Sequence, residues 1–417
     1  MKNKYGIDLA IPDKRADARH PVQKGVSAAI PIWRLFMGGN CVLAIAFWFC
    51  VGLTASAQIQ PQNRFVTFDV PSADETSPNA GTFPCCINTA GMIAGIYVDA
   101  NGLQHGFVRS PNGHITTFDV PNSTQIFAIH GVNEFGMITG EYFDTESLVH
   151  GFLRTPNGQF ATFDGPGAGP LPGLGTQARS INQFGVIAGD YWDENYVAHG
   201  FVRTLDGKIT KFDAPGAGTT AGSFQGTYIN SINLWGTLSG GYVDSTGVGH
   251  QFVRIPNGTF ATYDAPDAGP GLTLSTSLNT VGTVAGHYFD ANFLPHGFVR
   301  TQGGQITEFD PPDSIVGTYA NGINPFGVVV GFYGDQSYAW HGYLRTAGGR
   351  FVTFGAPGAG TGYGEGTGAP CVGNFVQFVP CIAINSKGVI TGSFVDANNG
   401  AHGFIRLPVL LNREKDE

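Results

Sequence analysis

The sequence predicts an all-β protein: a seven-bladed β-propeller of four-stranded blades, closed by an N-terminal strand that completes the last blade. Three observations predict it. The chain contains a repeat of constant internal spacing, residues alternate with a period of two inside each repeat, and a strand missing from the last repeat is present before the first. Such a repeat indicates units that must stack, because none of them can bury its apolar side alone.

Each repeat begins with an asparagine and has a histidine seventeen residues later. In all but the last repeat, a Phe or Tyr follows the histidine after thirteen more residues. The asparagines are Asn88, Asn133, Asn182, Asn233, Asn279, Asn324 and Asn385, and the histidines are His105, His150, His199, His250, His296, His341 and His402. The constant offset indicates one structural unit used repeatedly.

The third repeat shows the four expected strands. Residues 178–182 form the innermost strand, because small side chains recur two positions before the asparagine, where neighbouring backbones approach closely. Alternation from 185 to 191 predicts the second strand. Residues 199–203 and 209–213 form the third and fourth strands, and Asp206-Gly207 between them suits a tight hairpin turn.

The ends of the array predict closure. The last repeat stops after His402 to Arg406, without a fourth strand, whereas residues 64–69 have the sequence of a fourth strand and precede the first repeat. An open array would need capping units instead. We therefore expect a ring spanning residues 64–408, sealed by its N-terminal strand and left without a long free edge.

The remaining segments predict export. Residues 1–57 combine a long basic region, an apolar run at 41–53 and small residues that suit cleavage after Ala57. The apolar run is short for a membrane span, and an uncleaved signal anchor is the alternative. Residues 58–63 would be a linker and 409–417 a charged tail. The expected location is secreted or periplasmic.

Net charge limits the partners. The leader holds 7 of the 22 Lys and Arg and 3 of the 31 Asp and Glu, so cleavage leaves 15 basic and 28 acidic residues. Phosphate binding needs clustered Lys and Arg, so neither nucleic acid nor, after cleavage, a membrane surface is expected as a partner. We expect a monomer without cofactor or metal.

The cysteines that remain after cleavage suit disulfides in an exported chain. They are Cys85, Cys86, Cys371 and Cys381. Cys371 is expected to pair with Cys381, and a bridge between the first and last inter-blade loops is the alternative, because connectivity does not follow from sequence.

The pattern Ile-Asn-x-x-Gly-x-Ile-x-Gly-x-Tyr, then His-Gly-Phe-x-Arg, then Thr-Phe-Asp-x-Pro resembles the bacterial extracellular HAF repeat family. The resemblance covers about residues 64 to 408, with Gln251 replacing the glycine once and Tyr343 replacing the phenylalanine once. It implies an exported protein of repeated β units. It implies no catalytic residues, because the family is not associated with an established activity.

Residues that recur in every repeat are interpreted as structural, since an active site normally occurs once in a chain. Each repeat histidine is expected to bond to the aspartate six residues before it, which would satisfy both polar groups. These aspartates are Asp99, Asp144, Asp193, Asp244, Asp290, Asp335 and Asp396. The arginine four residues after each histidine, and the tyrosine of each second strand, receive the same interpretation.

Residues that do not recur are the candidates for function. Three positions before each asparagine, on the inner strand, a polar set could line a central channel: His130, Arg179, Asn230, Thr276 and Asn321. In the second strands, Glu141, Asp190 and His287 stand at matching points. Two carboxylates could bind a cation or act as acid and base on a glycoside, but equivalent points on neighbouring blades are expected to lie too far apart for this.

Loops that vary in length are where function is usually placed on a rigid frame. The longest loop runs from Gly355 to Ala383 and holds Tyr363, a candidate ligand contact, and Glu365, a weak candidate acid or base. The sequence therefore predicts an exported, non-catalytic propeller that recognises a glycan, an envelope component or a protein. The alternative is a polysaccharide-active hydrolase or lyase on the same frame, using Glu141, Asp190, His287 or Glu365.

Overall fold

The computed structural model describes residues 64–78, 80–269, 273–368 and 382–408. All of them belong to one compact unit, Ile59–Glu417. The predictions for residues 1–57, 58–63 and 409–417, and for Cys371 and Cys381, lie outside the described residues. Within the described part, none of the elements is a helix of the length and apolarity needed to cross a membrane.

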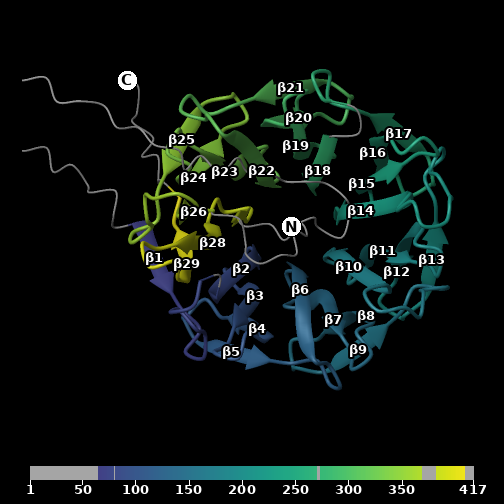
Figure 1. The fold of residues 1–417 in the computed structure, drawn as a ribbon, viewed down its shortest axis with the longest axis horizontal. Helices are drawn as coiled ribbons and strands as arrows, with labels where there is room; N and C mark the ends of the chain where they lie inside the picture. Colours follow the sequence, from purple (N-terminus) through teal and green to yellow (C-terminus); the bar gives the residue numbers. More distant parts are fainter. Residues whose placement is uncertain (1–63, 79, 270–272, 369–381, 409–417) are drawn as a thin grey trace, which may run out of the picture. The chain divides into compact units, whose positions relative to one another are not determined.

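The strands pair antiparallel in groups of four consecutive strands (Figure 1). The groups are β2 (Gly81–Ile87), β3 (Ile93–Val98), β4 (Gln104–Arg109) and β5 (Ile115–Phe118); β6 (Gln125–Val132), β7 (Ile138–Phe143), β8 (Val149–Arg154) and β9 (Phe160–Phe163); β10 (Thr176–Ile181), β11 (Ile187–Trp192), β12 (Ala198–Arg203) and β13 (Ile209–Phe212); β14 (Gly226–Ile232), β15 (Leu238–Val243), β16 (Gly249–Arg254) and β17 (Phe260–Tyr263); β18 (Thr273–Leu278), β19 (Val284–Phe289), β20 (Pro295–Arg300) and β21 (Ile306–Phe309); and β22 (Gly317–Ile323), β23 (Val329–Gly334), β24 (Trp340–Arg345) and β25 (Phe351–Phe354). In each group the first strand lies innermost and the fourth outermost in Figure 1.

The last group combines both ends of the described chain. It contains β26 (Gly366–Thr367) and β27 (Ile382–Ile384), both paired with β28 (Ile390–Val395), followed by β29 (Ala401–Arg406). Its fourth strand is β1 (Phe65–Phe68), which pairs antiparallel with β29. Thr67 lies opposite Phe404 in this register. The predicted pairing of the N-terminal strand with the C-terminal hairpin is therefore confirmed.

All groups have the same orientation, which gives the unit two distinct faces. The start of a third strand meets the start of the next group's first strand in a parallel bridge, as Ala198 does with Gly226 and Ala401 with Gly81. We call the face with these strand starts, and with the longer loops between groups, the loop face. The opposite face carries the tight turns after the first and third strands, and we call it the turn face.

One carboxamide at the end of each inner strand joins neighbouring groups. The side-chain Nδ2 of an asparagine donates to the backbone carbonyl of the asparagine in the next group, at 2.9 to 3.3 Å. Asn385 donates in this way to Asn88, which links the last repeat to the first. The Oδ1 atom accepts the amides two and four residues later, as Asn182 does from Phe184 and Val186. Both ends of the carboxamide are thus satisfied, although the side chain is buried.

Neighbouring groups also pack through aromatic and guanidinium groups. The repeat arginine lies over the aromatic ring of the preceding group's fourth strand, with 4.4 to 5.0 Å between the guanidinium carbon and the ring centroid. At the seam between the chain ends, Arg109 covers Phe68 of β1. An apolar cluster that includes Ile93, Phe107 and Ile405 fills the same seam. The core therefore lies between adjacent groups, and the seam is packed like the other interfaces.

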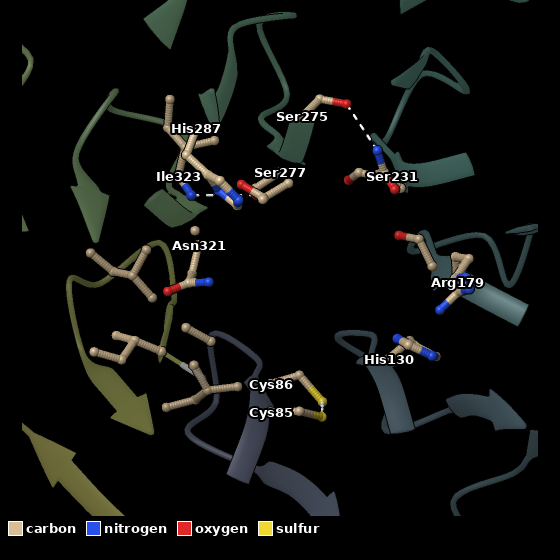
Figure 2. A pocket seen from close by; sticks show the side chains of 18 residues that line it. Cys85, Cys86, His130, Arg179, Ser231, Ser275, Ser277, His287, Asn321 and Ile323 are labelled. Atoms are coloured by element: carbon tan, nitrogen blue, oxygen red, sulfur yellow. Dashed lines mark hydrogen bonds between the residues drawn. The ribbon is translucent and has the colours of Figure 1, made fainter. Parts of the chain in front are cut away.

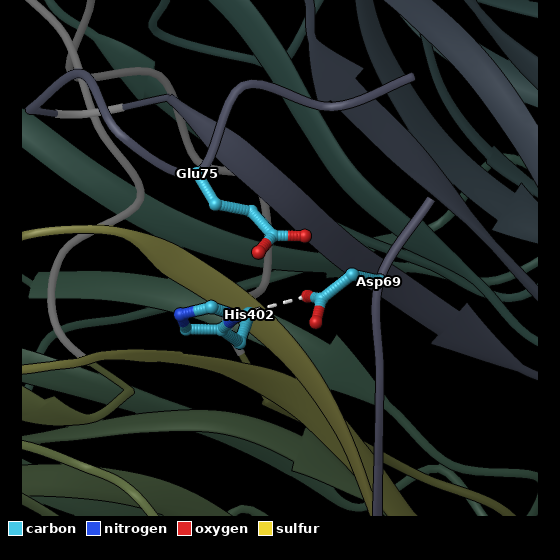
Figure 3. Close-up of side chains that lie close together, drawn as sticks. All are labelled: Asp69, Glu75 and His402. Atoms are coloured by element: carbon cyan, nitrogen blue, oxygen red, sulfur yellow. Dashed lines mark hydrogen bonds and ion pairs between the residues drawn. The ribbon is translucent and has the colours of Figure 1, made fainter. Parts of the chain in front are cut away.

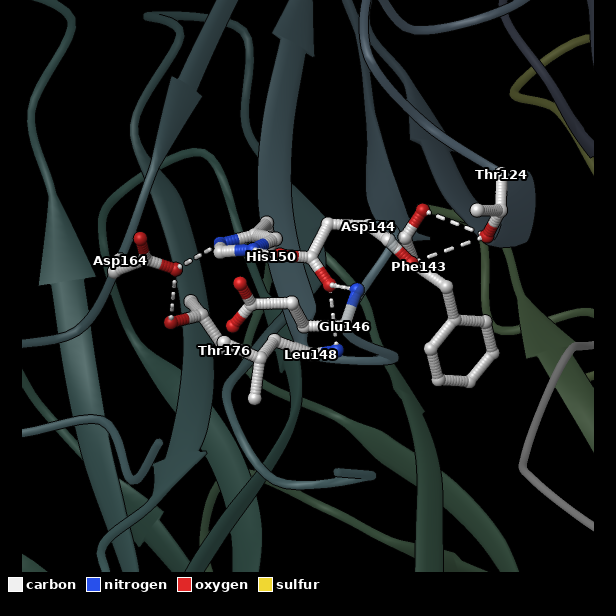
Figure 4. Close-up of polar contacts among 8 residues, drawn as sticks. All are labelled: Thr124, Phe143, Asp144, Glu146, Leu148, His150, Asp164 and Thr176. Atoms are coloured by element: carbon white, nitrogen blue, oxygen red, sulfur yellow. Dashed lines mark hydrogen bonds and ion pairs between the residues drawn. The ribbon is translucent and has the colours of Figure 1, made fainter. Parts of the chain in front are cut away.

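The repeat histidines have a closer partner than the one predicted. His150 Nδ1 is 2.8 Å from Asp164 Oδ1, and its Nε2 is 3.3 Å from Asp144, the expected partner (Figure 4). In most other repeats the expected aspartate lies 3.6 to 3.9 Å away, so the aspartate after the fourth strand makes the shorter contact. Gly355 replaces that aspartate in one repeat, and there His341 bonds to Asp335 at 2.9 Å instead.

The tyrosines of the second strands stack on these imidazoles, with ring centroids 5.0 to 5.3 Å apart. Phe394 keeps the stacking on His402 at 5.1 Å without a hydroxyl, which explains why phenylalanine is accepted in that repeat.

Replacing one asparagine of this set should destabilise the whole unit. In Asn182→Ala, one donated and two accepted hydrogen bonds of a buried side chain are lost, so we expect the free energy of unfolding to fall by about 3 kcal/mol. Denaturant unfolding measures this loss. Asn195→Ala is the control, since this exposed loop side chain bonds only within its own turn. Equal stability of the two variants would contradict the structural role.

Stability should also depend on pH through the histidines. The hydrogen bond from Asp213 raises the pKa of His199 despite the opposing effect of burial. A raised pKa in the folded state stabilises the fold fully below the unfolded value, about 6.5, and this contribution disappears as pH rises through the folded value. The melting temperature of His199→Gln should therefore approach that of the wild type as pH rises. Asp213→Asn should weaken the same pH dependence.

Candidate functional site

A β-bulge in the inner strand positions each of the predicted channel residues His130, Arg179, Asn230, Thr276 and Asn321. The ladder between β6 and β7 shifts at Ile129/Gly131, which leaves His130 without a partner residue on the neighbouring strand. Equivalent shifts occur around Arg179, Asn230, Thr276 and Asn321. A bulge redirects a side chain out of the regular pleat. Here it frees the predicted residues to turn toward the centre of the molecule.

These side chains line one cavity of about 240 Å³ between the inner strands (Figure 2). All the predicted channel residues contribute to it: His130, Arg179, Asn230, Thr276 and Asn321. His287, predicted as a weak catalytic candidate, lines it too, together with Ser231, Ser275 and Ser277. The wall is therefore mostly polar, as the sequence predicted.

Two cysteines form an apolar part of the wall. Cys85 and Cys86 lie on β2 and line the cavity, with their Sγ atoms 2.8 Å apart. The predicted pairing of Cys371 with Cys381 falls outside the described residues, so the disulfide connectivity stays a prediction.

A charged cluster lies behind His130 and Arg179. Glu141 Oε1 is 3.3 Å from His130 Nε2 and 3.8 Å from Arg179 Nη1. Asp190 Oδ1 is 3.7 Å from Arg179 Nε and accepts the Ile229 amide at 3.1 Å. Both carboxylate side chains are only 1% exposed. Arg179 from the intervening strand β10 therefore contacts both carboxylates and connects Glu141 with Asp190.

The surroundings shift the pKa values of these carboxylates in opposite directions. Burial disfavours the charged form of Glu141, but the attraction of Arg179 and the contact with His130 outweigh it and lower the pKa. Burial dominates at Asp190 and raises the pKa to about 6, against the weaker attraction of Arg179. Burial likewise lowers the pKa of His287 to about 4, so this imidazole is neutral at physiological pH.

Several polar atoms of the site have no hydrogen-bond partner among the described residues. They include His287 Nδ1, Asn321 Oδ1, Asp190 Oδ2, Arg179 Nη1 and both carboxylate oxygens of Glu141. Buried polar groups are rarely left unsatisfied without a reason, and an absent ligand or water is a common one. By contrast, Thr276 Oγ1 donates to the Ala320 carbonyl, and Asn230 Nδ2 donates to Ser275 Oγ.

The candidates of the longest loop lie apart from the cavity. Tyr363 is 62% exposed and packs on Tyr338, with ring centroids 5.2 Å apart. Glu365 Oε2 accepts the Gly362 amide at 2.7 Å, so its carboxylate holds its own loop together. Neither residue lines the central cavity. Glu365 is therefore better described as a structural residue than as an acid or base.

Asp69, Glu75 and His402 gather at the seam between the chain ends (Figure 3). Their possible ligand atoms lie within 4.8 Å of one another. However, His402 Nδ1 is hydrogen-bonded to Asp69 at 3.0 Å, as the histidines of other repeats are to the equivalent aspartate. The group is therefore a variant of the repeated histidine–aspartate contact, to which Glu75 adds a carboxylate.

Sequence reasoning missed a set of exposed apolar residues on the turn face. Two positions after the asparagine, five repeats carry a large apolar side chain: Phe135, Phe184, Trp235, Val281 and Phe326. We call this set the crown. Their exposed fractions range from 56% to 71%. The signal was present in the sequence, because an apolar residue repeated at a tight turn has no role in an inner core.

No protein family matches the sequence, and no curated protein resembles it closely enough to be recognised as a relative. Solved structures do resemble the fold. A catalytically inactive virginiamycin B lyase from Staphylococcus aureus, in complex with quinupristin, matches with a TM-score of 0.51 and 13% identity over 83% of this chain and 99% of that one. The radial arrangement of four-stranded antiparallel groups is that of a β-propeller (Figure 1).

Two further matches are weaker. A streptogramin B lyase gives a TM-score of 0.49 at 14% identity, covering 84% of this chain and all of that one. The six-bladed fucose-recognising lectin of Aleuria aurantia gives 0.38 at 14% identity, over 64% of this chain and 92% of the lectin. At these identities the likeness extends to the fold and not to the activity.

The two buried carboxylates should respond in opposite ways to an isosteric amide. Glu141→Gln should lower the melting temperature at neutral pH, because a carboxylate with a lowered pKa stabilises the fold above its unfolded value, about 4.3. Asp190→Asn should raise the melting temperature at neutral pH. Burial raises the pKa of Asp190 to about 6, so the ionised carboxylate destabilises the fold above about that pH. Below about pH 4 the gain from Asp190→Asn should vanish. Effects of the same sign at neutral pH would contradict the assigned charges.

Proposed function

We propose that this chain is an exported, non-catalytic recognition module in which a closed seven-bladed propeller holds a polar ligand, such as a glycan, in its central cavity. Export rests on the leader sequence at residues 1–57. Closure rests on β1 pairing with β29, on Asn385 bonding to Asn88 and on Arg109 covering Phe68. The repeat asparagines then correspond to one blade each.

The observation that carries the binding role is the unmet hydrogen-bonding capacity of the cavity. His287 and Asn321 line it, and the buried atoms His287 Nδ1 and Asn321 Oδ1 have no hydrogen-bond partner among the described residues. Each such atom costs free energy in the unliganded protein, and a ligand with hydroxyl groups would recover it. A glycan offers many hydroxyl groups that donate and accept. The same site also suits a polar envelope component or the tip of a protein loop.

The binding role and the structural role can be separated at Asn321. In Asn321→Leu a side chain of similar size replaces a carboxamide whose oxygen is unsatisfied, so the melting temperature should stay the same or rise. Affinity for the ligand should fall about tenfold or more for the lost hydrogen bonds. A glycan array, followed by calorimetry on the sugar that binds, measures the affinity.

Asn195→Leu is the matched control, because this exposed loop asparagine is remote from the cavity. Its affinity should equal that of the wild type. Unchanged affinity in Asn321→Leu would remove the cavity from the recognition site, and the absence of any binding on the array would point away from glycans.

A hydrolase or lyase acting on polysaccharide is the second candidate. The opposite pKa shifts of Glu141 and Asp190 favour it, since an acid and a base need such a difference. Asp190 also lines a second cavity, of about 260 Å³, with Tyr228 and Tyr242. Glu141 lines neither cavity, which makes the pair less suited to a substrate. An enzyme should release product from a polysaccharide and lose turnover in Asp190→Asn, whereas a recognition module should release none.

A further inference from the structure

Exposed large apolar residues occur on both faces of the described part, and those of the turn face include the crown, whose members recur at one repeat position. The crown surrounds the turns that follow the inner strands, and Trp235 is 67% and Phe326 71% exposed. Leu205, Ile255 and Leu407 add exposed aliphatic side chains near the turns that follow the third strands. Exposed aromatic residues gathered on one face of a protein usually mark a surface that is covered in use.

The crown is held in place by the frame. The backbone amide of each crown residue donates to the Oδ1 atom of its repeat asparagine at 3.0 to 3.2 Å. The same carboxamides link the groups, so the exposed rings are fixed relative to one another. Between Phe184 and Trp235 lies a hollow of about 410 Å³, and a second of about 560 Å³ lies between Trp235 and Val281. The surface is thus rigid, apolar and grooved.

Charges are divided between the two faces. The aspartates that flank the repeat histidines all lie on the loop face, because they follow the second and fourth strands. The turns of the opposite face carry Lys208, Arg350 and Lys387, and all the repeat arginines end their strands there. Glu134 and Asp206 are the acidic residues among these turns in the described part of the chain. The turn face is therefore net positive, although the protein as a whole is net negative.

The chain enters and leaves the propeller on this face. β1 begins at Phe65, which lies opposite Arg406 at the end of β29, and the Leu407 amide donates to the Arg64 carbonyl. The sequence before β1 includes the apolar run at 41–53.

We propose that the turn face docks on an anionic lipid bilayer, with the crown inserted among the headgroups and the acidic loop face turned away from the surface. Aromatic side chains favour the interface between headgroups and acyl chains. Lysine and arginine near the surface add attraction to anionic lipids. This proposal goes beyond the recognition role, since it concerns the crown and not the lining of the cavity, and it departs from the expectation that no membrane partner exists.

A lipid surface accounts for the crown better than a second copy of the chain or a bound peptide does. A second copy of the chain would bring two positive faces together, which costs electrostatic energy. A single peptide would fill one hollow and leave the remaining crown residues exposed. A bilayer covers the whole crown at once and complements the positive charge of the turn face.

The test uses the full chain and vesicles of phosphatidylcholine with phosphatidylglycerol. Lipids brominated near the headgroup should quench the emission of Trp235, and the quenched component should be lost in Trp235→Phe. This readout is independent of binding by the leader. Vesicle flotation should show about tenfold weaker binding for Phe184→Ser/Trp235→Ser, since two buried rings are lost. Added salt or pure phosphatidylcholine should weaken binding of the wild type.

The matched control is Leu103→Ser/Phe293→Ser, which removes two exposed apolar side chains from the loop face. Serine already occupies the position equivalent to Phe293 in the second repeat, as Ser147, with a similar positive φ. The control should bind vesicles like the wild type. Quenching that persists unchanged in Trp235→Phe, or equal binding of both double variants, would overturn the proposal. A crown-dependent dimer in sedimentation without vesicle binding would also overturn it and make the face a self-association surface.

Discussion

The repeat asparagine satisfies two structural demands with one carboxamide. Its nitrogen bonds to the next group, and its oxygen closes the turn within its own group, as Asn233 shows with Asn279 on one side and Trp235 and Thr237 on the other. Loss of the carboxamide therefore removes both the hydrogen bonds that close the turn and the hydrogen bond to the next group. This coupling explains why an uncharged amide stands at every inner turn, because an aspartate lacks the donor and a serine lacks the reach.

The inner strands give up regular pairing to build the cavity. A bulge removes ladder hydrogen bonds around His130 and Arg179. Burial of these two side chains together with Glu141 and Asp190 also costs desolvation free energy. The fold offsets this cost through the packing between groups, where fully buried rings such as Phe152 and Phe201 recur. Packing between groups, through residues that recur from repeat to repeat, thus stabilises the fold. The residues that differ between repeats line the cavity.

Sequence periodicity predicted the strands, the pairing of β1 with β29 and the ring of polar residues at the centre, since all of them follow from constant spacing. Three features did not follow. The bulges depend on the register of backbone pairing between neighbouring strands, which cannot be read from the spacing of residues along the sequence. The contact of Glu141 and Asp190 with one Arg179 depends on side-chain length across three strands. The closer partner of His150 is Asp164, which is remote in sequence and adjacent only after the hairpin of β8 and β9 forms.

The composition of the last group sets an order of events during synthesis. β1 leaves the ribosome first, yet its partner β29 is made last, and the bond between Asp69 and His402 spans 333 positions. Throughout elongation this short apolar strand therefore has no edge to join. The pairing of β1 with β29 can therefore form only after the final hairpin has been synthesised.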